Sequence, residues 1–332
     1  CPEMDEMHLV VFHIGPVQDF IVSARRTRDL WFGSWVLSEL SKAAALEVVR
    51  RNGDSVDCLI FPAPATLKEL NAPELSVPNK IVALVQHPAG EFAHKVKEAV
   101  ADRLEEIRKD AFGPGRIKGE LDTRETAKAQ VDDLPEFYWA SCPVVNGDYA
   151  GARNRVESLL AARKTTREFD PVTWGNNTPK SSLDGQRESV IPETEYPRPG
   201  APPEERKRIA RKLRGNYGVR EGERLCGVGL LKRHGERGND PRFFSTSHVA
   251  SLPLLRRLTD QQATDRYLRA LADAGIKPGD LNKVPTKHPV FGRNDGHLLF
   301  EERLTDYLDD DAKLSEAKKA LRQFLKDALK GE

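Results

Sequence analysis

The chain has 332 residues, of which 39% are hydrophobic and 31% charged, and its 52 basic residues nearly cancel its 51 acidic residues. This length exceeds one average domain, so two are expected, and the balance of charge excludes a general attraction to nucleic acid or membranes. No apolar run approaches the roughly 20 residues of a membrane span, and no signal-peptide pattern opens the chain. Its four cysteines show no paired spacing, so a cytoplasmic protein without a disulfide framework is expected.

Strand-like and helical patterns alternate over the first 150 residues. The order strand, helix, strand, strand, helix, strand is typical of an α+β, ferredoxin-like sheet with both helices on one face. A generic α+β domain is the alternative. The predicted strands cover 8–14, 56–61, 80–86 and 136–145, and the predicted amphipathic helices cover 17–51 and 90–112.

The character of the sequence changes after residue 150. A short helix is expected over 151–163, and a stretch rich in Gly, Pro and Asn follows it. From about residue 245 the pattern is mostly helical again. We therefore predict a ferredoxin-like domain (1–150), an irregular region with a basic helix (151–240) and a helical domain (241–332).

One stripe of the first predicted helix is poor in packing residues. Thr27, Trp31, Ser34 and Ser38 lie on one face at helical spacing, and a glycine such as Gly33 costs a helix roughly 1 kcal/mol relative to alanine. Close helix–sheet packing is one explanation, with the hydroxyls bonded to the preceding turn. A notch for a flat ligand is the other, with Ser34 as its hydrogen-bond partner.

The segment that carries this stripe resembles a known family. "IGPVQDFIVSARRTRDLWFGSWVLSELSKAAA" is similar to the opening of the large cyclase/polymerase-like subunit of type III-B CRISPR effector complexes, the Cmr family. Other motifs agree in order, so the resemblance extends over nearly the whole chain. They are "VPNKIVALV", "KSSLDGQRESVI", "ERLCGVGLLKR" and "FFSTSHVASLP".

The resemblance implies an antiviral subunit with two palm-like ferredoxin domains, separated by a zinc-binding element and a helical domain. Such a subunit converts ATP into cyclic oligoadenylates when the guide RNA complex recognises target RNA. ATP lies between the palms, and the second palm holds a Gly-Gly-Asp-Asp-type motif with Mg or Mn. The implied partners are guide RNA, target RNA and other Cmr subunits, and the implied nucleotide contacts are Gly15, Gln18, Gly33 and Ser34.

The sequence departs from the family pattern in its catalytic motifs. None of its eight histidines is followed by aspartate, so the HD nuclease is not expected, and no Gly-Asp-Asp occurs. The chain ends about where the catalytic palm would be expected to start. We therefore expect the N-terminal part of the subunit, with no catalytic residues of its own and with ATP and Mg or Mn bound only in the complete subunit. A purely structural scaffold that holds neighbouring subunits and guide RNA is the alternative.

Three of the four thiols of the family's zinc-binding element are missing. The positions that match its two Cys-x-x-Cys pairs are Ser181 or Ser182 with Asp184, and Cys226 with Gly229. Structural zinc takes four thiolate or imidazole ligands, so no zinc is expected. A mixed site completed by Asp184 or His234 is the alternative.

The basic run "RKRIARKLR" is the candidate for contact with RNA. A solvated helix face is the commoner meaning of such a run, with Ile209 and Leu213 on the side that docks. A subunit that assembles with guide RNA could instead direct its basic side chains at phosphate. The candidate residues are Arg206, Lys207, Arg208, Arg211, Lys212 and Arg214.

Overall fold

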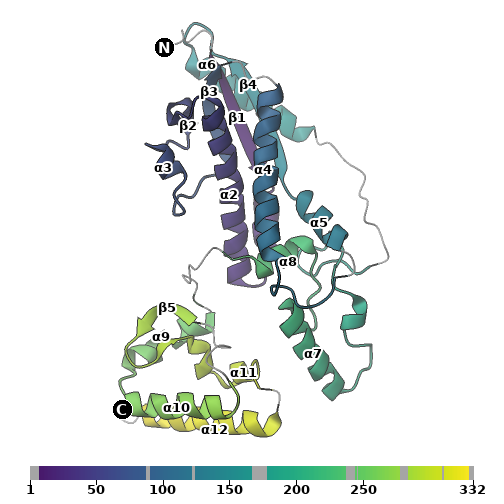
Figure 1. The fold of residues 1–332 in the computed structure, drawn as a ribbon, viewed down its shortest axis with the longest axis vertical. Coiled ribbons are helices and arrows are strands. Elements are labelled where there is room, and N and C mark those ends of the chain that lie inside the picture. Colours follow the sequence, from purple (N-terminus) through teal and green to yellow (C-terminus); the bar gives the residue numbers. More distant parts are fainter. Residues whose placement is uncertain are drawn as a thin grey trace. The chain divides into compact units, whose positions relative to one another are not determined.

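The chain divides into two compact units, Cys1–Arg237 and Gly238–Glu332. Each unit is described by itself, because their placement relative to one another is not determined (Figure 1). The finer division into three domains stays a prediction. The computed structural model describes residues 7–86, 90–121, 124–166, 178–236, 244, 246–276, 283–308 and 310–328.

The first unit is organised by a four-stranded sheet in which every pair of neighbours is antiparallel. The strand order is β2-β3-β1-β4, which places β1 between β3 and β4. Val10 of β1 therefore lies opposite Ala83 on one side and Ser141 on the other. The strands are β1 (Met7–Gly15), β2 (Leu59–Phe61), β3 (Lys80–Gln86) and β4 (Glu136–Pro143).

Helices cover both faces of this sheet. The long helices α2 (Thr27–Arg51) and α4 (Gly90–Ala111) lie side by side on one face (Figure 1), and α6 (Tyr149–Thr165) packs on the other. Successive side chains of a strand point to opposite faces. Val10, Phe12 and Ile14 accordingly enter the core beneath α2 and α4, whereas Leu9 and Val11 enter the core beneath α6.

The predicted order of strands and helices is present in the structure, and the mixed α+β class is confirmed. β3 has the predicted bounds, and α4 ends one residue earlier than predicted. β2 is shorter, because Val56–Cys58 form a 3-10 helix before it. A short helix, α3 (Leu67–Leu70), lies between β2 and β3.

The prediction of one continuous helix from Val17 to Arg51 is wrong. The chain forms α1 (Gln18–Val22), breaks, and begins again at Thr27 with α2. Arg26 is extended, with φ −111° and ψ 137°, and the Ala24 amide donates to the Val22 carbonyl over 2.6 Å rather than to the carbonyl one turn back. Backbone carbonyls at the end of α1 therefore remain available to hydrogen-bond donors from other parts of the chain.

The rest of the first unit has a core of its own, which lies between helices and connecting segments. Tyrosine hydroxyls tie these segments together: Tyr196 donates to the Glu223 carbonyl over 2.8 Å, and Tyr217 to the Glu120 carbonyl over 2.6 Å. Residues 167–177 of the predicted irregular stretch lie outside the described part. The helices here are α5 (Arg124–Asp132), a 3-10 turn (Glu193–Glu195), α7 (Pro203–Tyr217) and α8 (Gly227–His234).

The second unit is mainly helical and also contains a two-stranded antiparallel sheet. Tyr267 and Phe324 stack in its core with ring centroids 4.9 Å apart. Beside this core, the buried His297 lies 3.2 Å from Asp295. Its elements are α9 (Thr246–Arg257), α10 (Gln261–Asp273), β5 (Lys283–His288), β6 (Gly292–Asn294), a 3-10 turn (Gly296–Leu299), α11 (Glu301–Leu304) and α12 (Asp311–Ala328).

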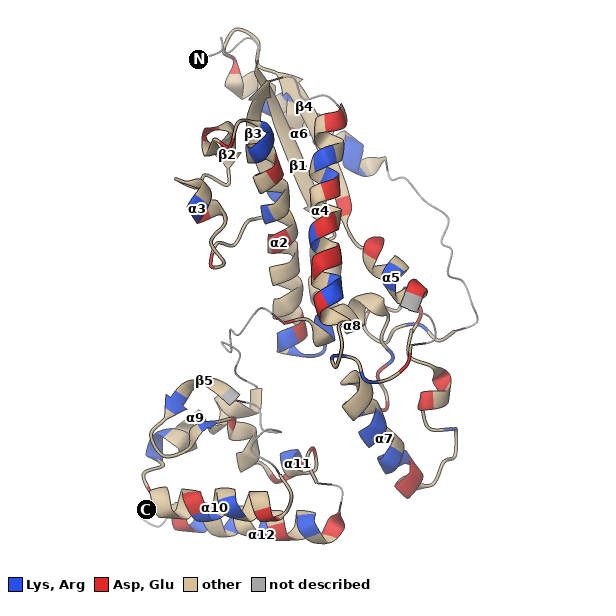
Figure 2. Cartoon of the chain, viewed as in Figure 1, with Lys and Arg blue, Asp and Glu red and all other residues tan. Residues whose placement is uncertain are grey.

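Charged residues of both signs mark the outer faces of the long helices. Figure 2 shows acidic and basic residues following one another along α4, whose buried residues are apolar. In the part of the chain that the structure describes, no helix is long and apolar enough to cross a membrane.

Candidate functional site

The four residues with implied nucleotide contacts lie around the junction of α1 and α2, here defined as residues 18–34. Gln18 and Ser34 are exposed, whereas Gly15 and Gly33 are buried. Leu30, one turn before Ser34 on the same helix face, keeps 42% of its surface exposed. No hydrogen bond of the Ser34 hydroxyl occurs among the described residues. This face therefore presents an apolar side chain and a hydroxyl to solvent.

The notch at Gly33 is filled by the chain itself. A Cβ at this position would lie 3.3 Å from Cδ of Lys232 and 3.4 Å from Cε1 of Phe20. The first distance is shorter than an ordinary carbon–carbon contact, and the second is at its lower limit. Gly33 is thus explained by the crossing of a lysine stem from α8, on the side of α2 that faces the protein.

Gly15 has a similar explanation. A Cβ there would lie 3.2 Å from Oε2 of Glu136, the residue opposite it on β4. Further along the stripe, Ser38 is buried and its hydroxyl accepts a hydrogen bond from the Val77 amide over 2.8 Å. The small residues of the stripe thus divide into packing positions and the exposed Ser34, whose contact with nucleotide stays a prediction.

Lys232 closes the break between α1 and α2. Its ammonium group donates to the Phe20 carbonyl over 2.7 Å and also to the Ser23 carbonyl. The same group lies 4.8 Å from the centroid of the Phe20 ring, within range of a cation–π contact. Burial lowers the pKa of Lys232 to about 8, because the charged form is poorly solvated there.

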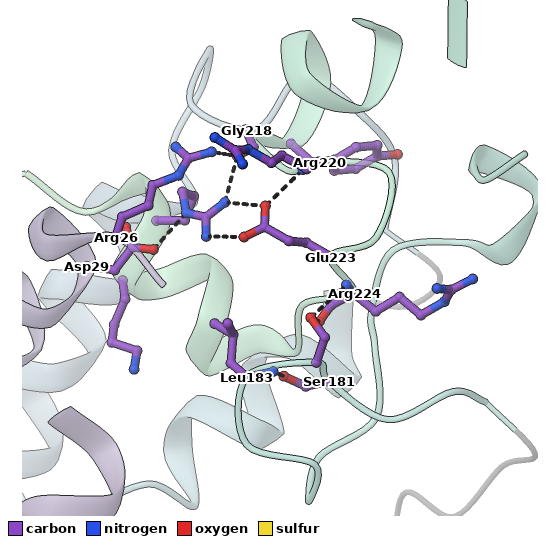
Figure 3. Close-up of polar contacts among 12 residues, drawn as sticks. Arg26, Asp29, Ser181, Leu183, Gly218, Arg220, Glu223 and Arg224 are labelled. Atoms are coloured by element: carbon purple, nitrogen blue, oxygen red, sulfur yellow. Dashed lines mark hydrogen bonds and ion pairs between the residues drawn. The ribbon is translucent and has the colours of Figure 1, made fainter. Parts of the chain in front are cut away.

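Arg233, the next residue of α8, forms a buried ion cluster with two acids. Its Nε donates to Asp29 over 2.8 Å, and Nη2 lies 3.3 Å from Glu223. The side chains of Arg233 and Asp29 are both 1% exposed. Figure 3 shows Asp29 and Glu223 on the two sides of this guanidinium, with the Gly218 carbonyl also in the cluster.

The Gly218 carbonyl joins two arginines in this cluster. It accepts from Arg233 over 2.6 Å and from Arg26 over 2.5 Å. Burial and the neighbouring Arg233 lower the pKa of Arg26 to about 10. Burial would raise the pKa of Glu223, but the Arg220 amide and the Arg233 guanidinium hold it below its usual value. Both acids of the cluster therefore balance buried positive charge.

The end of α8 is also fixed by close packing. A Cβ on Gly235 would lie 2.0 Å from Cζ of Phe32, so only glycine fits between the end of α8 and the first turns of α2. Arg28 donates to the Gly235 carbonyl over 3.0 Å. The sequence prediction missed α8 and both of its cations. The sequence feature that could have indicated this helix and its cations is the apolar run ending in Lys-Arg within "ERLCGVGLLKR".

The positions that match the family's zinc ligands do come together, at the start of α8. The Cys226 thiol lies 3.6 Å from Oδ2 of Asp184 and accepts the Gly229 amide over 3.4 Å as the cap of the helix. Nearby, the Ser182 hydroxyl and the Arg224 backbone exchange hydrogen bonds of 3.2 Å. The segments around Ser182, Asp184 and Cys226 are thus held together by hydrogen bonds.

The absence of zinc stays a prediction, and it rests on the number of ligands. Burial raises the pKa of the Cys226 thiol to about 11, and this is one thiol at positions where structural zinc takes four thiolate or imidazole ligands. His234 is eight residues away on the same helix, or about 12 Å along its axis, and its ring is bonded to the Tyr217 carbonyl. Among the described residues, no group of three or more His, Cys, Asp or Glu is arranged to hold a metal.

The basic run lies on α7, and all six of its candidate RNA contacts are exposed. Acidic side chains already bind several of them. Arg206 donates to Glu221 over 2.7 Å, and Lys212 lies 2.8 Å from Glu195. Lys207 donates to Glu204 over 3.0 Å. The run is therefore less positive than its sequence indicates, and its contact with RNA stays a prediction.

Comparison with known proteins supports the resemblance in the part of the chain that contains the α1–α2 junction. Residues 9–109 match the family described as CRISPR-associated protein Cmr2, N-terminal. The chain thus contains a Cmr2-like N-terminal segment, as its motifs predict. No curated protein matches the sequence.

Solved structures extend the likeness of fold. One chain of the apo-state cryo-EM structure of type III-B Cmr-beta matches this protein with a TM-score of 0.52 and 15% identity. The match covers 96% of this protein and 42% of the Cmr-beta chain. This protein therefore spans less than half the length of the Cmr-beta chain. A chain of type III-B Cmr-beta bound to cognate target RNA is matched over 69% of this chain and 32% of that one, with 16% identity and a TM-score of 0.38.

Arg233→Gln should destabilise the first unit by about 3–5 kcal/mol, because Asp29 and Glu223 would stay buried without their cation. Chemical denaturation followed by tryptophan fluorescence measures this, since all four tryptophans lie in the first unit. The control is Arg50→Gln, which removes an exposed partner of Glu47 and should change the unfolding free energy little. Equal effects of the two variants would contradict a central role for the buried cluster.

The purified chain should contain no stoichiometric zinc, and Cys226→Ser should leave both its metal content and its stability nearly unchanged. Serine is a favoured helix cap and can accept the Gly229 amide in place of the thiol. Elemental analysis and denaturation measure the two properties. About one zinc per chain, lost in Cys226→Ser, would instead establish the mixed-ligand site.

Proposed function

We propose that this chain is the N-terminal part of the large subunit of a type III-B CRISPR interference complex. In the complete subunit it contributes one wall of an ATP site used to make cyclic oligoadenylates. The observation that carries the proposal is the family match over residues 9–109, which includes the exposed Ser34 face. Catalysis belongs to the second palm of that subunit and its Mg or Mn.

The topology of the sheet supports a ferredoxin-like first palm. Its strands follow the order β2-β3-β1-β4 with antiparallel neighbours, and the two long crossover helices pack on one face. This is the arrangement of the split βαβ motif repeated twice.

The chemistry of the junction supports a nucleotide ligand. Leu30 and Val22 expose 42% and 74% of their surfaces, and the exposed Ser34 and Gln18 can donate or accept hydrogen bonds. A base needs an apolar surface for its face and a few polar groups for its edge. The junction offers both, and the second palm would supply the groups that bind phosphate and metal.

The proposed partners are guide RNA, target RNA and other Cmr subunits. The solved structure that is bound to cognate target RNA comes from type III-B Cmr-beta, and the exposed basic residues of α7 are the candidates for phosphate contact in this chain. The purely structural scaffold remains the second candidate function. It is favoured by the acidic partners of α7 and by the packing explanations for Gly15 and Gly33.

Ser34→Ala should weaken ATP binding to the complete subunit about fivefold, the usual net value of one hydrogen bond, and Ser34→Leu should weaken it more by excluding the base. Because Ser34 is exposed, neither variant should lower the melting temperature appreciably. Calorimetric titration with ATP and thermal unfolding measure the two effects. Ser158→Ala, an exposed serine on α6 at the opposite face of the sheet, is the control. Unchanged ATP affinity in both Ser34 variants would favour the scaffold.

Arg208→Gln should weaken assembly with the guide RNA complex and reduce the slope of log affinity against log salt by about one. Arg206→Gln should have a smaller effect, because Glu221 already binds its guanidinium. Affinities measured at several salt concentrations give both slopes. Replacing all six basic residues of α7 by glutamine without any change of slope would leave α7 as a solvated face.

A further inference from the structure

The buried ammonium group of Lys232 donates to two backbone carbonyls, that of Phe20 in α1 and that of Ser23 just after it. It reaches them from α8, more than 200 residues later in the sequence, by crossing Gly33. We infer that Lys232 is a positioning residue for the proposed nucleotide wall. It holds α1 against α2 and so sets how Gln18 and Val22 lie relative to Ser34. This inference rests on the proposed function.

α1 has five residues, far fewer than an isolated helix needs for stability in water, so it depends on contacts with the rest of the unit, among them the buried Phe20 side chain. The chain turns away after Val22, so the Phe20 carbonyl does not receive the Ala24 amide, which binds Val22 instead. Lys232 supplies the missing donor. A buried carbonyl without a donor would favour a different placement of α1.

α8 has contacts with α2 that do not involve Lys232. Arg233 binds Asp29 in the first turn of α2, and Gly235 lies against the Phe32 ring. Loss of the Lys232 ammonium should therefore release α1 while α8 keeps its position. The effect should be local to residues 17–24, which a general loss of stability would not produce.

A ligand at Ser34 would also be affected by the position of α1. Val22 and Leu30 are both exposed apolar side chains, and they belong to the two sides of the break that Lys232 closes. Methionine at 232 keeps the apolar stem beside Gly33 and Phe20 but lacks the donor. Lys232→Met thus removes the hydrogen bonds with little change in packing.

A second buried lysine provides a matched control. Lys42 of α2 is 6% exposed and donates to the Ala72 carbonyl over 2.8 Å. It lies nine residues beyond Gly33 on α2, or about 14 Å along the helix axis. Lys42→Met therefore removes a lysine–carbonyl bond from the same unit at a distance from the junction, together with the 3.3 Å ion pair between Lys42 and Glu39.

The experiment compares the complete subunit with its Lys232→Met and Lys42→Met variants. By hydrogen exchange, the amides of Ile21, Ser23 and Ala24 should exchange roughly tenfold faster in Lys232→Met, since their local bonds depend on α1. Lys42→Met should not change them. In oligoadenylate synthesis, Lys232→Met should raise KM for ATP roughly fivefold and leave kcat within about twofold. A loss of folded protein would lower kcat instead.

Unchanged exchange at residues 17–24 in Lys232→Met would overturn the inference, as would equal exchange in the two variants. An unchanged KM in Lys232→Met, with KM raised in Ser34→Leu, would overturn the inference and leave the proposed function in place. An unchanged KM in both Lys232→Met and Ser34→Leu would overturn the nucleotide wall itself, and the inference with it. The two failures are thus distinguished by the Ser34→Leu variant.

Discussion

Two adjacent cations at the end of α8 determine how the first helices of this chain are held. Successive residues of a helix point about 100° apart, so Lys232 and Arg233 serve different partners. Lys232 binds neutral carbonyls at the end of α1, and Arg233 binds the carboxylates of Asp29 and Glu223. A guanidinium keeps its charge at any ordinary pH, so Arg233 requires buried acids. The position of α8 on α2 is therefore fixed by charge as well as by apolar packing.

Much of the sheet and its helices could be predicted because each element carries its own periodicity. The apolar run of β3 and the amphipathic pattern of α4 define those elements locally. The break after Val22 could not be predicted in this way, because the donor to its carbonyls is a lysine at position 232. α8 was missed for a related reason. Its two glycines disfavour helix, yet a Cβ on Gly227 would lie 2.3 Å from the Ala127 carbonyl oxygen, so its docking requires one of them.

The nucleotide contact of the candidate site stays a prediction, and the reason for its unusual glycine could be found only in the structure. Gly33 could be recognised as unusual within a helix, but the sequence left packing and ligand binding open. The structure assigns its notch to Lys232 and Phe20, and leaves Ser34 as the exposed polar residue beside it. Which residues of the stripe face the protein depends on how α2 packs, through tertiary contacts such as the hydrogen bond from the Val77 amide to the Ser38 hydroxyl.

α8 connects the segment around Cys226 and Asp184 to the α1–α2 junction. Cys226 and Asp184 lie at its beginning, and Lys232 and Arg233 lie at its end, nearly two turns further on. The Gly227 amide also donates to the buried Gln130 over 2.7 Å. A metal at the matching positions would fix the beginning of this helix by coordination. In this chain a thiol cap and an amide side chain bond to the first turn of the helix, and its two cations reach α1 and α2 from the other end.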